Sequence, residues 1–86
     1  MEPVFQTPAW EDYLYWQQQD KKTLIRINSL IRDTLRSPFK GIGEPEALRG
    51  DLSGCWSRRI NEEHRLVYAV MENRLHILQC RYHYFR

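Results

Sequence analysis

The order of hydrophobic and polar residues changes character near the middle of the chain. In residues 10–16 and 24–35, apolar side chains recur every three or four positions, with polar or charged residues between them. This period is typical of helices that bury one face. The first half of the chain is therefore predicted to form two consecutive helices.

Residues with special backbone preferences mark the expected ends of both helices. We expect Thr7 to cap the first helix and Pro8 to occupy its first turn, where the missing N–H of proline costs nothing. Asp20 is the expected cap of the second helix, because its carboxylate accepts hydrogen bonds from free N–H groups. This helix should end before Ser37, because Pro38 disfavours helical backbone at the preceding residue. The two helices are therefore expected to be antiparallel.

The second half of the chain predicts strands. Its apolar residues alternate with polar ones or form short β-branched and aromatic runs, separated by turn-forming residues. All four glycines fall in residues 38–54, which are predicted to form an ordered loop. The predicted strands are residues 4–6, 46–49, 56–60, 65–71 and 75–82. We therefore expect a single α+β domain over residues 1–86, in which the two N-terminal helices pack on one face of a mostly antiparallel twisted sheet and leave the other face open.

Composition narrows the class of protein. Hydrophobic residues make up 42% of the chain and aromatic residues 13%, well above the content of a disordered segment. No apolar run approaches the length of a membrane span and the first residues do not resemble a secretion signal, so a cytoplasmic protein is expected. Cys55 and Cys80 fit no common zinc-binding spacing, and we expect two free, buried thiols rather than a disulfide.

Positive charge is concentrated in the second half of the chain. Residues 49–86 contain seven arginines, no lysine and four acidic residues, a net charge of +3. Arginine binds phosphate through two parallel hydrogen bonds and stacks on bases. Composition alone leaves two alternatives open, an anion-binding site and an ordinary solvated sheet surface.

The predicted pairing of Arg59 with Arg65 bears on whether the surface binds an anion. If the turn between two predicted strands centres on Glu62, Arg59 and Arg65 lie opposite one another on the same face. Like charges in that position are destabilising, so the pair needs a compensating anion. Glu46 or Glu63 would supply it structurally, and a phosphate would supply it functionally.

The last residues bring together groups that suit RNA. Histidine is a residue type that commonly transfers protons in catalysis, and His83 lies between Tyr82 and Tyr84, whose aromatic rings can stack on unpaired bases. For Tyr82, the alternation favours packing on the core instead. RNA can be cleaved without metal or cofactor if a carboxylate deprotonates the 2′-OH, a cation stabilises the phosphorane and an acid protonates the leaving oxygen. Glu46, Arg65 and His83 provide one group of each kind.

Glu46 ends the stretch Gly-Glu-Pro-Glu at residues 43–46, and three further motifs follow, two of which contain Arg65 and His83. They are Leu-Ser-Gly-Cys-Trp-Ser-Arg-Arg-Ile at residues 52–60, Glu-His-Arg-Leu-Val-Tyr at 63–68 and Cys-Arg-Tyr-His-Tyr at 80–84. Together they closely resemble the YoeB family of toxins in the RelE/ParE superfamily, and the resemblance extends over residues 10–84. It implies a microbial-ribonuclease-like fold and an endonuclease that cuts messenger RNA in the decoding site of the small ribosomal subunit. It also implies a YefM-type antitoxin as partner and a homodimer.

The resemblance also implies roles for individual residues. Glu46 corresponds to the family's general base, Arg65 to its phosphate-stabilising residue and His83 to its general acid, while Tyr84 is expected to help hold the substrate. The product would be a 2′,3′-cyclic phosphate. Four further arginines are expected to contact RNA or the ribosome: Arg49, Arg58, Arg59 and Arg81.

Two other functions fit the same fold. ParE-type members of the superfamily inhibit DNA gyrase by binding and need no acid or base. A catalytically inactive member retained as a repressor partner of its antitoxin is a third possibility.

One geometric conflict accompanies the predicted site. Our register places Arg65 opposite Cys80, which puts His83 on the other face of the sheet. Either the residues beyond Tyr82 leave the sheet, or a bulge intervenes, or the register is off by one. We expect the first.

Overall fold

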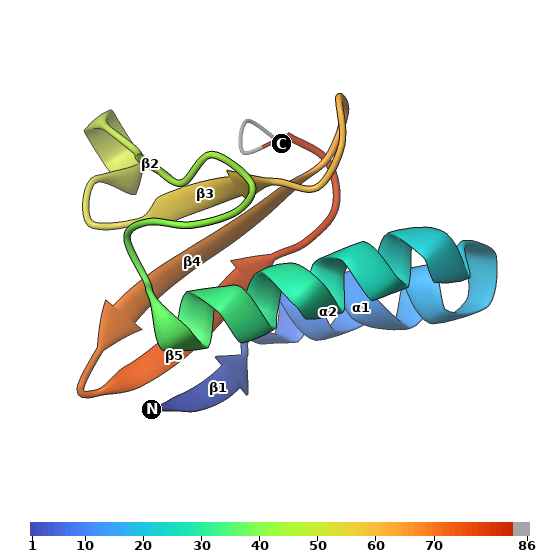
Figure 1. Ribbon diagram of the computed structural model, residues 1–86, viewed down its shortest axis with the longest axis horizontal. Coiled ribbons are helices and arrows are strands. Elements are labelled where there is room, and N and C mark those ends of the chain that lie inside the picture. Colours follow the sequence, from blue (N-terminus) through green and yellow to red (C-terminus); the bar gives the residue numbers. More distant parts are fainter. Residues whose placement is uncertain (84–86) are drawn as a thin grey trace.

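Two antiparallel helices lie on one face of a five-stranded sheet (Figure 1). The computed structural model describes residues 1–83, so Tyr84 lies outside the described residues. Helix α1 is Thr7–Gln19 and helix α2 is Lys21–Arg36. The predicted α+β fold is confirmed.

Three of the four predictions for the helix ends are confirmed: the Asp20 cap, the end of α2 before Ser37, and Pro8 in the first turn of α1. The Asp20 carboxylate accepts hydrogen bonds from the backbone N–H groups of Lys22 and Thr23 at 3.1 and 3.2 Å, and α2 ends before Ser37 as predicted. The predicted Thr7 cap is wrong, because Thr7 already lies inside α1 and Gln6 occupies the cap position. The Gln6 backbone N–H donates to the carbonyl of Ile77, so the first strand's pairing continues directly into the helix.

The strand order is β1-β5-β4-β3-β2, with β1 parallel to β5 and the other pairs antiparallel. The strands are β1 Glu2–Phe5, β2 Glu46–Ala47, β3 Trp56–Arg59, β4 Arg65–Met71 and β5 Arg74–Gln79. Only β4 has its predicted bounds. Strand β2 is shorter because a 3₁₀ turn, Gly50–Leu52, follows soon after it, and β5 ends three residues early.

The core lies between the helices and the sheet. Leu66, Tyr68 and Ile77 are fully buried and pack with Ile27 and Leu30 of α2. Successive side chains of a strand point to opposite faces, so the residues between them belong to the face away from the helices. We call that second face the open face.

A bulge between β4 and β5 changes the register within this hairpin. Tyr68 pairs with Ile77, as our predicted register requires, but Val67 pairs with Gln79 because the ladder shifts by one residue there. The chain then leaves the sheet after Gln79. The bulge, the second of our three explanations, is therefore correct within the strand. The chain also leaves the sheet, as we expected, but it does so after Gln79 and not beyond Tyr82.

Composition also predicted free cysteines and no membrane-spanning segment. Both cysteines are free, as predicted, although Cys55 is only half-buried while Cys80 is fully buried. Within residues 1–83, neither helix is long and apolar enough to cross a membrane.

Candidate active site

Register and alternation place three of the predicted residues on the open face. Glu46 pairs with Ser57, and Arg59 pairs with Arg65, as predicted. Ser57 and Arg59 are two residues apart in β3 and therefore share a face. Ser57 also pairs with Val67, whose neighbours in the core, Leu66 and Tyr68, point toward the helices. Glu46, Arg59 and Arg65 consequently belong to one surface.

Glu46 and Arg59 line the same shallow hollow, together with Glu44 and Pro45. The Glu46 side chain is exposed, and no hydrogen bond or ion pair to another of residues 1–83 engages its carboxylate. Arg59 forms ion pairs with Glu44 at 3.6 Å and Glu62 at 3.9 Å. These two carboxylates, rather than Glu46 or Glu63, offset the Arg59–Arg65 repulsion. Because the side chains of Arg59, Glu44 and Glu62 are all exposed, these ion pairs hold Arg59 only weakly.

Arg65 is half-buried and uses one side of its guanidinium to hold the turn before β4. Its Nη1 donates to the carbonyls of Asn61 at 2.7 Å and His64 at 3.0 Å, and makes a longer contact with Glu62 at 3.3 Å. Its Nε and Nη2 have no partner among the described residues. The other edge of the fork can therefore receive an anion in a bidentate manner.

The segment that carries His83 is anchored to α1. The Asp12 carboxylate accepts a hydrogen bond from the backbone N–H of Cys80 at 3.0 Å, and the Trp16 indole N–H donates to the Cys80 carbonyl at 2.8 Å. Both side chains are buried. Two residues of one helix thus fix the point at which the chain leaves the sheet.

Gln79 brings the backbone of His83 to the open face. Gln79 pairs with Val67 and so belongs to the row that contains Ser57 and Glu46. Its side-chain amide donates to the carbonyl of Arg81 at 2.9 Å and to that of His83 at 3.0 Å. The backbone of residues 81–83 therefore lies on the side of the open face, where the Tyr82 carbonyl accepts from the Arg65 N–H.

Tyr82 differs from its prediction. Its side chain is 41% exposed instead of packed on the core, and its backbone has a φ of +66°. Bulky residues rarely adopt this left-handed conformation. It is stabilised here because the Tyr82 N–H donates to His64 Nδ1 at 2.7 Å while its carbonyl accepts from the Arg65 N–H at 3.0 Å. The alternation on which the prediction depended ends with β5.

Arg58 corrects a second expectation. Its side chain is fully buried and does not reach an RNA surface. The guanidinium donates to Asp33 at 2.6 Å and to Tyr68 at 3.2 Å, and it also bonds three backbone carbonyls, those of Ser37, Lys40 and Ile42. Simple alternation in β3 already placed Arg58 on the helix side, since Ser57 and Arg59 face the other way.

The acid stability of the protein is expected to depend on Asp33. Hydrogen bonds from the Ile42 backbone N–H and from Arg58 lower the pKa of Asp33 from its ordinary 3.8 to about 2. Between these values the unfolded chain binds more protons than the native one, so the stabilisation present above pH 3.8 is lost as the pH falls to 2. Asp33→Asn should therefore flatten the dependence of the urea midpoint on pH between about 4 and 2. An unchanged slope would contradict this assignment.

The two remaining predicted arginines differ in their surroundings. Arg49 is exposed and has no side-chain partner within the described part of the chain. Arg81 is half-buried, with its guanidinium 3.4 Å from the centre of the Tyr15 ring and 4.5 Å from that of Tyr82. The exposed Arg49 side chain is available to an anion, whereas the Arg81 guanidinium stacks mainly on the Tyr15 ring.

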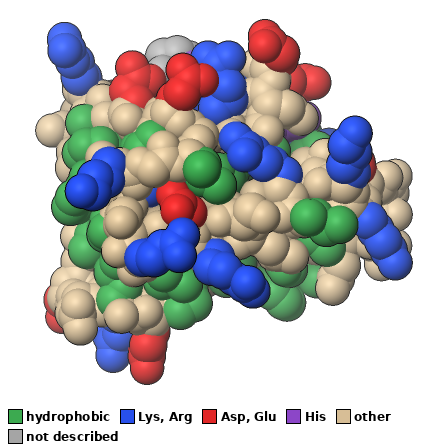
Figure 2. Space-filling view, in the orientation of Figure 1, with side chains coloured by type: hydrophobic (Ala, Val, Ile, Leu, Met, Phe, Trp, Pro, Cys, Tyr) green, Lys and Arg blue, Asp and Glu red, His purple; other side chains and the backbone are tan. Residues whose placement is uncertain are grey.

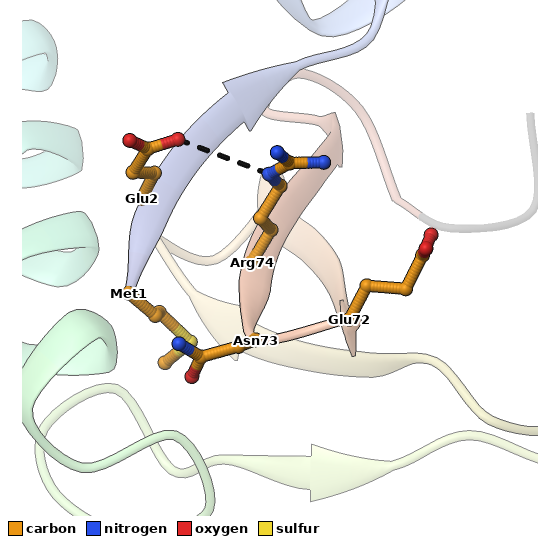
Figure 3. A pocket seen from close by; sticks show the side chains of 5 residues that line it. All are labelled: Met1, Glu2, Glu72, Asn73 and Arg74. Carbon is orange, nitrogen blue, oxygen red and sulfur yellow. Dashed lines mark ion pairs between the residues drawn. The ribbon is translucent and has the colours of Figure 1, made fainter.

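Other parts of the surface that the structure describes do not gather the predicted site residues. On the face shown in Figure 2, which carries the helices, Lys and Arg side chains are spread out rather than gathered in one patch. A second hollow lies at the turn between β4 and β5, where Arg74 forms a 3.8 Å ion pair with Glu2 (Figure 3). None of the predicted site residues lines that hollow.

This chain is similar to a family of bacterial toxins. The family model described as the YoeB-like toxin of bacterial type II toxin–antitoxin systems matches residues 5–84. The toxin YoeB of Escherichia coli K12 is 57% identical over 84 residues, which cover 98% of this chain and all of the relative. A solved YoeB/ParE toxin from Agrobacterium tumefaciens superposes with a TM-score of 0.95 at 49% identity, covering 98% of this chain and all of that one.

Two solved structures from Staphylococcus aureus are also similar. One is described as a heterotetrameric YoeB–YefM toxin–antitoxin complex and the other as a YoeB dimer. Their toxin chains are 48% identical to this chain, with TM-scores of 0.89 and 0.90, and in each case 98% of both chains is covered.

Proposed function

This chain belongs to the YoeB-like toxins of bacterial type II toxin–antitoxin systems, and from that premise we propose that it is an endoribonuclease that cuts messenger RNA in the ribosomal decoding site. One observation carries the proposal. A carboxylate and an arginine without full sets of partners, Glu46 and Arg65, share the open face, and the backbone of His83 is held beside that face.

The proposed reaction needs no metal. Glu46 removes the proton from the 2′-OH, and the resulting oxygen attacks the adjacent phosphorus atom. His83 gives a proton to the departing 5′-oxygen, so that the upstream fragment ends in a 2′,3′-cyclic phosphate. Tyr84, which the structure does not describe, is proposed to help hold the substrate.

Arginines are proposed to stabilise the charge that develops on phosphorus. The Nε and Nη2 edge of Arg65 is available to the equatorial oxygens of the phosphorane, and a donor of this kind contributes most when it is already in position. Arg59 would bind a neighbouring phosphate, because its two ion pairs are exposed and easily exchanged. Arg49 and Arg81 are proposed to lie at the edge of this RNA contact.

The ribosome would supply the substrate positioning that this small surface lacks. A few phosphate contacts give only weak, salt-sensitive binding, whereas a codon held in the decoding site is already oriented for attack. We therefore place the protein in the cytoplasm with the ribosome. By analogy with the S. aureus structures, we propose a YefM-type antitoxin and a second toxin copy as its partners.

Primer extension on a translated message tests the proposal. The purified protein should produce cuts within codons when ribosomes are present and far fewer on the same message alone. Equal cutting without ribosomes would overturn the ribosomal role. If no cuts appear and the protein instead inhibits supercoiling by gyrase, the nuclease proposal is wrong and the chain acts as a gyrase-binding toxin.

A further inference from the structure

Two side chains hold the backbone on either side of the left-handed residue Tyr82. They are His64, from the turn before β4, and Gln79, from the end of β5. We infer that His64 and Gln79 are positioning residues that set the place of His83 for proton transfer. This inference depends on the proposed nuclease function, since it concerns the acid in that reaction.

His64 has a defined protonation form in this arrangement. Its Nδ1 lies 2.7 Å from the Tyr82 backbone nitrogen, which can only donate. Nδ1 must therefore present its lone pair, and the neutral ring carries its proton on Nε2, the atom 3.7 Å from the Glu63 carboxylate. A doubly protonated His64 could not accept this bond. The His64 ring is thus a hydrogen-bond acceptor for the segment of residues 80–83, which we call the tail.

The His64 ring is itself held rigidly. Its side chain is nearly buried and meets Trp16 edge to face, with the ring centres 4.8 Å apart. Its backbone N–H donates to the Asn61 side chain at 2.8 Å. Because Trp16 also donates to the carbonyl of Cys80, the ring and the start of the tail are fixed to the same helical residue.

Gln79 secures the other side of the turn. Its amide nitrogen faces the carbonyls of Arg81 and His83 at 2.9 and 3.0 Å, with that of Tyr82 farther away at 3.4 Å. Carbonyls only accept hydrogen bonds, so the amide must direct its N–H₂ group toward them. The bulge at Val67 is what turns Gln79 onto the open face and makes this contact possible.

The two anchors act at the point where the backbone is strained. A left-handed tyrosine is unfavourable in isolation, so Tyr82 keeps its φ of +66° only while surrounding bonds maintain it. Losing an anchor would let residues 81–83 relax toward ordinary backbone angles. A displacement of about 1 Å in a catalytic group can lower a rate by about 100-fold.

Paired substitutions at His64 separate hydrogen bonding from packing. His64→Phe keeps a ring against Trp16 but has no acceptor, whereas His64→Asn loses the ring but can place an oxygen near the position of Nδ1. We expect single-turnover cleavage on ribosomes to fall by about 10- to 100-fold in His64→Phe, and to recover in His64→Asn to within a few-fold of wild type. Toxin binding to ribosomes should be equal in all three proteins.

Gln79 offers a second, independent test. Gln79→Glu preserves the shape but points a carboxylate at three carbonyls, and it should reduce cleavage by about 10- to 100-fold. Gln18→Glu makes the same chemical change on the exposed side of α1 and should leave the rate unchanged. Wild-type cleavage in both His64→Phe and Gln79→Glu would overturn the inference.

Nuclear magnetic resonance provides a readout that does not depend on activity. A coupling across the N–H···N bond, between the ¹⁵N nuclei of Tyr82 and His64 Nδ1, is expected in the wild type and should be lost in His64→Phe. The Tyr82 amide should then exchange faster with solvent. If the wild type fails to cut RNA but shows this coupling, the nuclease proposal falls and the anchoring remains. If the coupling is absent, the anchoring itself is wrong.

Discussion

Replacing Glu46 or His83 with glutamine is expected to lower the single-turnover rate of RNA cleavage on ribosomes by about 10²- to 10⁴-fold each. Either change removes a proton-transferring group while keeping a side chain of similar size. The Glu46 carboxylate is exposed and has no partner among residues 1–83, so its loss should leave the urea midpoint unchanged. Stopped reactions with primer extension would measure the rates.

Glu11→Gln is the matched control for this experiment. Glu11 is exposed on α1, outside the open face, and its substitution makes the same charge change without touching the proposed site. The double variant should lose less than the product of the two single effects, because both groups act in one displacement step. Cleavage within a few-fold of wild type in either single variant would remove that residue from the reaction.

Arg58→Met is expected to destabilise the fold by about 3–5 kcal/mol. The substitution leaves Asp33 without its buried cation and three backbone carbonyls without their donor. Small domains have about 5–15 kcal/mol of unfolding free energy, so a large part of the total would be lost. Urea unfolding followed by tryptophan fluorescence would measure the change.

The neighbouring arginine provides the control for Arg58. Arg59→Met removes an exposed side chain whose ion pairs are long, and it should change the unfolding free energy by no more than about 0.5 kcal/mol. Equal stability of the two variants would show that the Arg58 network contributes little. This pair also distinguishes the roles of two adjacent arginines in one motif, since Arg59→Met should weaken RNA contacts without unfolding the chain.

The sequence predicted local structure well where one physical rule dominates. The Asp20 cap, the end of α2 before Ser37 and the bounds of β4 follow from hydrogen bonding, proline sterics and β-branched runs. The predicted turn also placed Arg59 opposite Arg65 on one face, because directly paired residues of antiparallel strands share a face. These features depend on neighbours in the chain or on a single hairpin.

Features that depend on distant partners were missed. A bulge was only one of our three alternatives, because the register shift at Val67 has no local mark such as glycine, yet it turns Gln79 onto the open face. Tyr82 adopts a left-handed backbone because His64 and Arg65 bond to it, a contact across almost twenty residues. Arg58 was grouped with surface arginines because residue type outweighed its position in β3, where only the buried acceptors of α2 and the following loop make a charge tolerable.

The contacts between α1 and the tail also have a consequence for the order of folding. The bond from Cys80 to Asp12 joins residues 68 positions apart, and the one from Trp16 spans 64. Closing such long loops costs more chain entropy than closing short ones, so we expect helices and hairpins to form before these bonds do. In a chain that has formed its helices and hairpins but not these bonds, Glu46 and Arg65 already lie on the open face. His83 is not yet in place. In the proposed reaction, we therefore expect the general acid to be the last of the three groups to reach its place.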